Sequence, residues 1–122
     1  MKVGDYVRTK YGKIGKIINI SKNRVSTTTY LIEWSSCKAY YVSQVKDYKS
    51  SPNIIDLIEV GDYVNGYKVL FAGAITWDND GNVIDKRVKI NYDGYDRWLS
   101  EDFIKSIVTK EQFESMEYKV GE

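Results

Sequence analysis

The chain has 122 residues, of which 43% are hydrophobic and 29% charged, so it is globular and long enough for one ordinary domain or two small ones. It contains no His and one Cys, which excludes His-based catalysis, His metal ligands, an internal disulfide and a Cys-based zinc site. Residues 1–52 carry ten basic and three acidic residues, a net charge of +7, whereas residues 53–122 carry eight basic and fourteen acidic residues, a net charge of −6. This asymmetry predicts two surfaces with different partners, or two halves that attract each other.

The first half reads as a series of short strands. β-Branched and aromatic residues are frequent and apolar residues often alternate, which predicts strands at residues 5–9, 13–21, 27–34, 38–42 and 46–49, with a turn at 43–45. Ser50, Ser51 and Pro52 then mark a boundary between two units. The apolar residues at 54–58 predict a packed linker through which the units contact each other.

The second half repeats this pattern. Strands are expected at residues 63–64, 67–77, 83–92, 96–99 and 104–108, with a turn at 100–103. Asn65-Gly66 is a strong signal for a two-residue hairpin turn. Thr109 and Gln112 form a capping box that predicts a helix over residues 110–116, and a last strand is expected at 117–120.

An internal repeat relates the two halves. Val3-Gly4-Asp5-Tyr6-Val7 recurs as Val60-Gly61-Asp62-Tyr63-Val64, and the same offset relates Tyr41-Val42-Ser43 to Trp98-Leu99-Ser100. Five short strands with a brief turn before the last are typical of a small SH3-like barrel. We therefore expect an all-β protein of two tandem SH3-like small barrels with a short C-terminal helix: a basic unit over residues 1–52 and an acidic unit over residues 53–122.

Two resemblances extend this interpretation. Gly4-Asp5-Tyr6-Val7 followed by Gly12-Lys13-Ile14-Gly15 resembles the start of KOW-type barrels, in which such glycines allow a tight turn and a strand bend. Residues 55–69 and 104–116 are similar to a module of small phage, prophage and plasmid accessory proteins of Gram-positive bacteria, whose middle part varies. Its segments here contain Val60-Gly61-Asp62-Tyr63-Val64-Asn65-Gly66-Tyr67-Lys68-Val69 and Ile104-Lys105-Ser106-Ile107-Val108-Thr109-Lys110-Glu111-Gln112-Phe113-Glu114-Ser115-Met116. The second resemblance implies a mobile-element protein that counters host defence, and it transfers no catalytic residue.

The first half offers a candidate nucleic-acid surface. Basic residues near the first hairpin alternate with tyrosines, a combination suited to phosphate contacts and base stacking. These residues are Arg8, Lys10, Lys13, Lys16, Lys22 and Arg24. The alternative is a solvated charged edge that prevents aggregation between strands.

The second half offers a candidate protein-binding surface. Acidic residues in its loops can imitate a row of phosphates and occupy a basic channel of a target, although Asp is also a common turn residue. Tyr and Arg near the last turn are of the types enriched at binding hot spots, and packing between the units is their alternative role. The predicted partner-binding residues are Tyr40, Tyr41, Asp93, Tyr95, Asp96, Arg97, Trp98 and Asp102. At least half of Trp34, Trp77, Tyr92 and Trp98 are expected in the cores.

Catalysis and cofactors are not indicated. Asp78-Asn79-Asp80-Gly81-Asn82 resembles the start of a calcium loop, but Lys89 stands where that loop needs a bidentate Glu, so no metal or other cofactor is predicted. No apolar run is long enough to span a membrane and no secretory signal is visible, so we expect a cytoplasmic protein of the host cell.

The resulting hypothesis is a non-enzymatic phage or mobile-element inhibitor, anti-CRISPR-like or of another counter-defence type. Its partner would be a host nuclease or effector, alone or in complex with nucleic acid. One alternative is a KOW-like module that binds nucleic acid directly. Another is a sponge that sequesters a nucleotide signal. The sequence does not indicate the oligomeric state.

Overall fold

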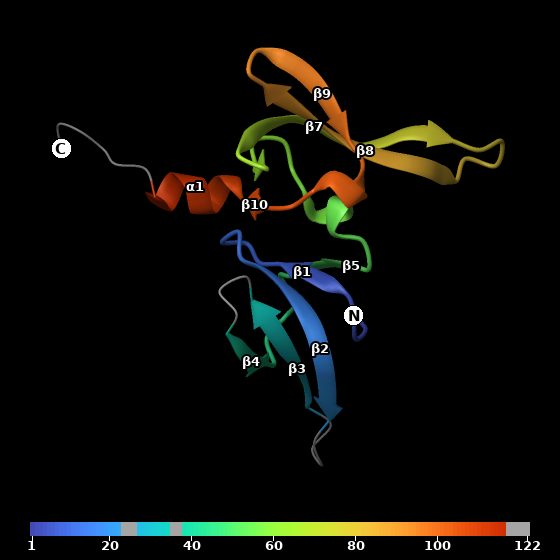
Figure 1. Ribbon diagram of the computed structural model, residues 1–122. Helices are drawn as coiled ribbons and strands as arrows, with labels where there is room; N and C mark the ends of the chain where they lie inside the picture. Colours follow the sequence, from blue (N-terminus) through green and yellow to red (C-terminus); the bar gives the residue numbers. More distant parts are fainter. Residues whose placement is uncertain (23–26, 35–37, 117–122) are drawn as a thin grey trace. The chain divides into compact units, whose positions relative to one another are not determined.

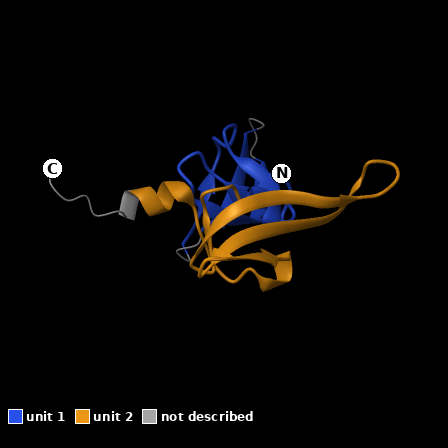
Figure 2. Ribbon diagram, turned by 90° about the horizontal axis from the view of Figure 1, so that it is seen from above, with its two compact units in different colours: residues 1–57 blue, residues 58–122 orange. Residues whose placement is uncertain are grey.

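The computed structural model describes residues 1–22, 27–34 and 38–116, and it divides the chain into two compact units, residues 1–57 (unit 1) and 58–122 (unit 2) (Figure 2). The described residues form two five-stranded antiparallel sheets and one short α-helix (Figure 1). The predicted fold class, all-β with two tandem SH3-like small barrels and a short C-terminal helix, is confirmed. The division falls after Leu57, later than the position inferred from Pro52, because the Arg8 guanidinium donates a hydrogen bond to the Leu57 carbonyl at 2.9 Å.

Unit 1 is a sheet with the strand order β4-β3-β2-β1-β5. Its elements are β1 (Tyr6–Arg8), β2 (Ile14–Lys22), β3 (Thr28–Trp34), β4 (Ala39–Val42), β5 (Lys49–Ser51) and the 3-10 helix η1 (Ile54–Leu57). Strand β1 pairs with both β2 and β5, which brings the first and last strands of the unit together. Strand β5 begins later than expected because Lys46 and Asp47 form a turn.

Unit 2 has the same topology. Its elements are β6 (Tyr63–Val64), β7 (Tyr67–Trp77), β8 (Val83–Tyr92), β9 (Tyr95–Leu99), the 3-10 helix η2 (Glu101–Phe103), β10 (Ile107–Val108) and α1 (Lys110–Met116). The strand order β10-β6-β7-β8-β9 is the order of unit 1 read from its other edge. The repeat in the sequence is therefore a repeat in topology.

The repeated Val-Gly-Asp-Tyr-Val segment forms the same turn in both units. Gly4 and Gly61 adopt φ values of +95° and +97°, which only glycine reaches without strain. The carboxylate of the next residue accepts a hydrogen bond from the backbone N–H three residues before it, at 3.0 Å for Asp5 and 2.8 Å for Asp62. Each turn leads directly into the first strand of its unit.

Each unit has its own core of strand residues. In unit 1 this core consists of Val7, Ile17, Ile32 and Trp34. In unit 2 the buried strand residues are Val64, Val69, Val88, Ile90 and Leu99. Full burial of such side chains stabilises the fold by about 1.5–3 kcal/mol each.

The expectation that at least half of four large aromatic residues belong to the cores is wrong. Trp34 is buried, but Trp77, Tyr92 and Trp98 are 55%, 38% and 45% exposed. Trp98 follows the alternation of a strand and points away from the face that buries its neighbour Leu99.

Trp77 lies in an extension of the β7–β8 hairpin. Strand β9 pairs with β8 only from Val88 onward and β6 pairs with β7 only at its first residues, so residues 73–77 and 83–87 pair only with each other among the described residues. We name these two segments the ribbon. In Figure 1 the ribbon is the yellow end of β7 and β8, and it extends beyond the other strands of unit 2.

The predicted capping box is present at α1. The Thr109 side chain accepts a hydrogen bond from the Gln112 backbone N–H at 3.3 Å, and the Gln112 side chain accepts one from the Thr109 N–H at 3.3 Å. The strand expected at residues 117–120 lies outside the described residues.

Candidate functional site

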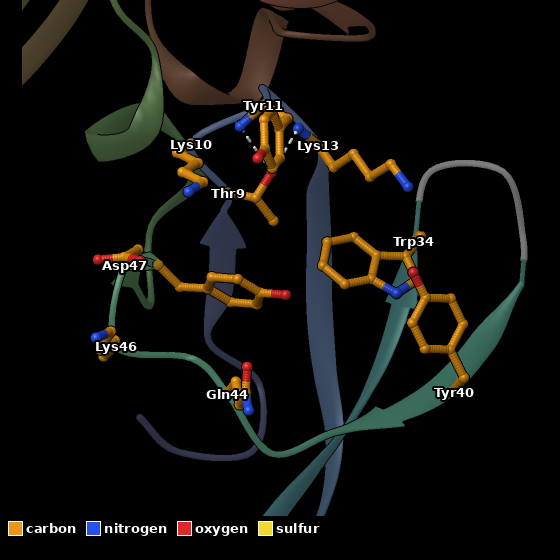
Figure 3. Close-up of a pocket in the computed structure, with 10 residues that line it drawn as sticks. Thr9, Lys10, Tyr11, Lys13, Trp34, Tyr40, Gln44, Lys46 and Asp47 are labelled. Carbon is orange, nitrogen blue, oxygen red and sulfur yellow. Dashed lines mark hydrogen bonds between the residues drawn. The ribbon is translucent and has the colours of Figure 1, made fainter.

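A pocket of about 370 Å³ lies in unit 1 between the β1–β2 loop, the end of β3, the start of β4 and the segment that leads into β5 (Figure 3). Figure 3 shows Lys13, Trp34 and Tyr40 on one side of this pocket and Lys46 and Asp47 on the other. The segments that line it are far apart in sequence and meet because β1 pairs with both β2 and β5.

The β1–β2 loop forms a tight wall of the pocket. The Thr9 hydroxyl accepts hydrogen bonds from the backbone N–H groups of Tyr11 and Lys13 at 3.3 and 3.1 Å. The Thr9 backbone N–H donates to the Lys13 carbonyl at 2.9 Å, and Gly12 adopts a φ of +84° to close the turn. This geometry leaves the side chains of Lys10, Tyr11 and Lys13 exposed around the pocket.

Aromatic rings line the pocket. The ring centroid of Trp34 lies 5.8 Å from that of Tyr40 and 6.2 Å from that of Tyr48, the latter in an edge-on arrangement. A Cβ on Gly15 would lie 2.9 Å from Cε3 of Trp34, so glycine at this position lets the indole pack against the backbone of β2. Burial, with a smaller contribution from Tyr40, raises the pKa of Tyr48, so its hydroxyl stays protonated at neutral pH.

Trp34 also carries an unpaired polar group. Its side chain is 6% exposed, and its indole N–H is buried without an acceptor among the residues that the structure describes. A buried N–H without a partner costs about 1–3 kcal/mol.

The rim of the pocket is basic. Lys10, Lys13 and Lys46 line it together with a single acid, Asp47, so its formal charge is +2. The Lys10 ammonium lies 5.1 Å from the centre of the Tyr11 ring, within the range of a cation–π contact.

The structure separates the six residues predicted to bind nucleic acid. Lys10 and Lys13 meet at the pocket, whereas Lys16 lies on β2 with its ammonium 5.5 Å from the centre of the Tyr6 ring. Lys22 ends β2, on the order of 25 Å along the strand from the loop. Arg24 lies outside the described residues.

The prediction that Arg8 belongs to the basic surface is wrong. Its side chain is 2% exposed and bonds to η1, so it is not available for surface contacts. The sequence pattern missed this burial because an arginine on a short strand next to lysines looks like a surface residue.

The residues predicted to bind a partner also fall into separate groups. Tyr40 lines the pocket of unit 1, whereas its neighbour Tyr41 is exposed on the other face of β4. In unit 2, Tyr95 and Arg97 lie on the face of β9 that also carries buried Leu99. The predicted triplet of Tyr95, Arg97 and Trp98 therefore does not form one surface.

Trp98 belongs to the outer face of the unit 2 sheet. Its ring makes an edge contact with Phe71 at 5.7 Å between centroids, and the Lys89 ammonium lies 5.6 Å from the centre of the Trp98 ring. Asp96 lies on the same face, with its carboxylate 3.6 Å from the Lys89 ammonium. Exposed Asp96 is thus partly neutralised, and such a pair contributes little to stability.

Two other predicted acidic residues occupy turns. Asp93 has a φ of +51° in the two-residue turn between β8 and β9, and Asp102 is exposed in η2. Their positions fit the turn preference of Asp as well as a partner contact.

Unit 2 has an aromatic cluster at the position equivalent to the pocket of unit 1, but a shorter turn lies beside it. By strand register, Tyr67, Tyr92 and Arg97 occupy the places of Gly15, Trp34 and Tyr40. Tyr67 packs on Tyr92 at 4.7 Å between centroids, and the Arg97 guanidinium lies 5.1 Å from the centre of the Tyr92 ring. Only two residues connect β6 to β7, so this turn has no equivalent of the longer β1–β2 loop that lines the pocket of unit 1.

The sequence pattern did not identify Thr9, Gln44, Lys46, Asp47 and Tyr48 as pocket residues. The available signal was Gly15, because a glycine within a strand indicates a close approach by another group.

Comparison of the chain with protein-family models, with curated proteins and with solved structures finds no significant match. Within residues 1–22, 27–34 and 38–116, no group of three or more acidic, His or Cys side chains is placed to hold a metal ion. In the same part of the chain, no helix has the length and apolar character needed to cross a membrane.

Proposed function

We propose that this chain is a non-enzymatic inhibitor from a phage or another mobile element, which acts in the host cytoplasm by binding a host nuclease or effector. The observation that carries the proposal is the exposed apolar surface of the ribbon. Ile75, Trp77, Val83 and Ile84 all lie on it, and Trp77 and Ile84 are 55% and 63% exposed. Several large exposed apolar side chains on one protruding element are typical of protein-binding sites.

The ribbon gains little stability from its own unit. A two-stranded hairpin without a third strand is at best marginally stable in water, because too little apolar surface is buried in it. A protein partner that buries the apolar side chains would stabilise the ribbon and gain the hydrophobic contacts at its hot spots.

Charge favours a basic partner. The tip of the ribbon carries exposed Asp78 and Asp80, and a hydrogen bond from the Asn82 backbone N–H lowers the pKa of Asp78. The Asp78 carboxylate is therefore charged at neutral pH. A nucleic-acid channel of a nuclease is a basic surface to which the acidic tip of the ribbon is complementary.

The assay starts with the tagged full chain, purified from its host with and without nuclease treatment. We expect a stoichiometric host nuclease or effector that resists the treatment, and we expect the added chain to inhibit nucleic-acid cleavage by that purified enzyme. The Trp77→Ser/Ile84→Ser variant should lose both capture and inhibition. Tyr11→Ser, which removes a 71% exposed aromatic residue from unit 1, is the matched control and should retain both.

Three other results would contradict the proposal that the chain is an inhibitor. Nucleic acid alone, lost on nuclease treatment or at high salt, would favour the KOW-like module. A copurifying phosphate-bearing small molecule without a protein would favour the nucleotide sponge. A captured enzyme whose activity the chain does not change would also refute the proposal.

A further inference from the structure

We propose that the pocket of unit 1 binds a nucleoside phosphate, either a free nucleotide or one unit of a single-stranded nucleic acid. This site lies in a different unit from the ribbon and does not depend on the inhibitor proposal. Its volume of about 370 Å³ is within the range of pockets that bind small molecules.

The indole of Trp34 supplies a directional contact. Its N–H is buried, and no described residue accepts a hydrogen bond from it. Nucleobases present carbonyl oxygens and ring nitrogens along their edges, and these accept hydrogen bonds from such donors. A base edge can satisfy the indole N–H once a shift of the Trp34 or Tyr40 ring exposes it, because the nitrogen is fully covered in the structure.

The aromatic rings supply a stacking surface. Tyr40 is 48% exposed beside the buried Trp34, with a centroid distance of 5.8 Å. A half-exposed ring that lines a pocket can stack on the face of a nucleobase. Such stacking contributes to binding with any of the bases.

The lysines supply the contact with phosphate. Lys10 and Lys13 extend from the tight β1–β2 loop, with Lys10 on the same side of the pocket as Lys46 and Lys13 on the other side (Figure 3). Lysine ammonium groups on two sides of a pocket are suited to a phosphate that enters between them.

Two other ligand classes fit less well. An acidic peptide would pair with the lysines but would leave the stacking surface without a planar group. A proline-rich peptide would pack on the aromatic rings but would gain nothing from three lysines. The combination of aromatic rings and lysines favours the nucleoside phosphate.

The test uses the full chain with Trp77→Phe and Trp98→Phe, which leaves Trp34 as the single tryptophan. Its fluorescence then reports on the pocket during titration with AMP and with a short oligothymidylate at low salt. A saturable change with either probe is expected. Calorimetry on the unmodified chain should give the same affinity.

Variants in this background identify the contacts. Tyr40→Ala should weaken binding by about fivefold or more through the loss of stacking. Lys13→Gln/Lys46→Gln should weaken binding of the oligothymidylate and reduce the slope of log affinity against log salt by about 1.4, since each phosphate contact contributes about 0.7. Lys22 lies far along β2 from the pocket. The matched control Lys22→Gln should therefore change neither the affinity for the oligothymidylate nor its salt dependence.

The two probes distinguish the two sources of the ligand. AMP that binds as tightly as the oligothymidylate indicates a free nucleotide, whereas strong preference for the oligothymidylate indicates single-stranded nucleic acid. The proposal is overturned if neither probe binds, if the pocket variants bind as well as the control, or if an oligoglutamate peptide binds more tightly than both probes. Inhibition of the host enzyme without binding of either probe would refute the pocket proposal alone. Binding of a probe without inhibition would refute the inhibitor proposal alone.

Discussion

Replacing Asp62 with alanine should destabilise unit 2 more than replacing its repeat equivalent, Asp5, destabilises unit 1. Asp62 is fully buried, and its two carboxylate oxygens accept hydrogen bonds from the backbone N–H groups of Glu59 and Lys110, each at 2.8 Å. The second bond ties the turn before β6 to the first residue of α1. A hydrogen bond to a charged group contributes about 1.5–3 kcal/mol, so Asp62→Ala should cost about 3–6 kcal/mol. Asp5 accepts the bond from Lys2 at 3.0 Å, and Asp5→Ala should cost about 1.5–3 kcal/mol.

Urea unfolding followed by NMR of the indole N–H signals separates the two units. Trp34 reports on unit 1, whereas Trp77 and Trp98 report on unit 2. Asp62→Asn is a graded control, because its single acceptor oxygen can retain only one of the two bonds and should give an intermediate loss. A loss of stability in Asp62→Ala no larger than that in Asp5→Ala would refute this account of the repeat.

Three further predictions test the local geometry. Gly15→Ala should lower the free energy of unfolding of unit 1 by about 1–3 kcal/mol, because the added Cβ would lie 2.6 Å from Cγ2 of Ile32; an unchanged urea midpoint would contradict this packing. Asn65→Gly keeps the left-handed turn conformation but removes three hydrogen bonds to backbone groups around η2, so unit 2 should lose about 1–3 kcal/mol; a neutral effect in the same urea assay would show that these bonds contribute nothing. Because the pKa of Asp78 is lowered, its stabilisation of the ribbon turn is present above pH 3.8 and is lost as the pH falls through the lower value; the Asn82 amide shift should titrate with a midpoint below 3.8, and a midpoint above it would be inconsistent with the hydrogen bonds.

The separation of the predicted surfaces has a simple cause. Residues that are consecutive in a strand point to opposite faces, so Arg97 and Trp98 cannot share a surface on β9. This alternation of side chains between the two faces of a strand could be inferred from the sequence. The burial of Arg8 was not, because it depends on a carbonyl 49 residues away in the chain.

The sequence by itself determined the local structure. Alternating apolar residues placed the strands, the repeated Val-Gly-Asp-Tyr-Val segment placed two units of the same topology, and Thr109 with Gln112 placed the helix start. These features depend on contacts between near neighbours and on periodicity, which a sequence displays directly.

Only the tertiary structure decided the pocket and the exposed ribbon. The pocket joins Thr9, Trp34 and Lys46, which meet because the first and last strands of unit 1 pair. The ribbon is exposed because β7 and β8 are longer than the strands that flank them, so its apolar residues lie beyond the core. Both features depend on which strands lie side by side and on where each pairing ends, and these are long-range properties that periodicity within one strand does not contain.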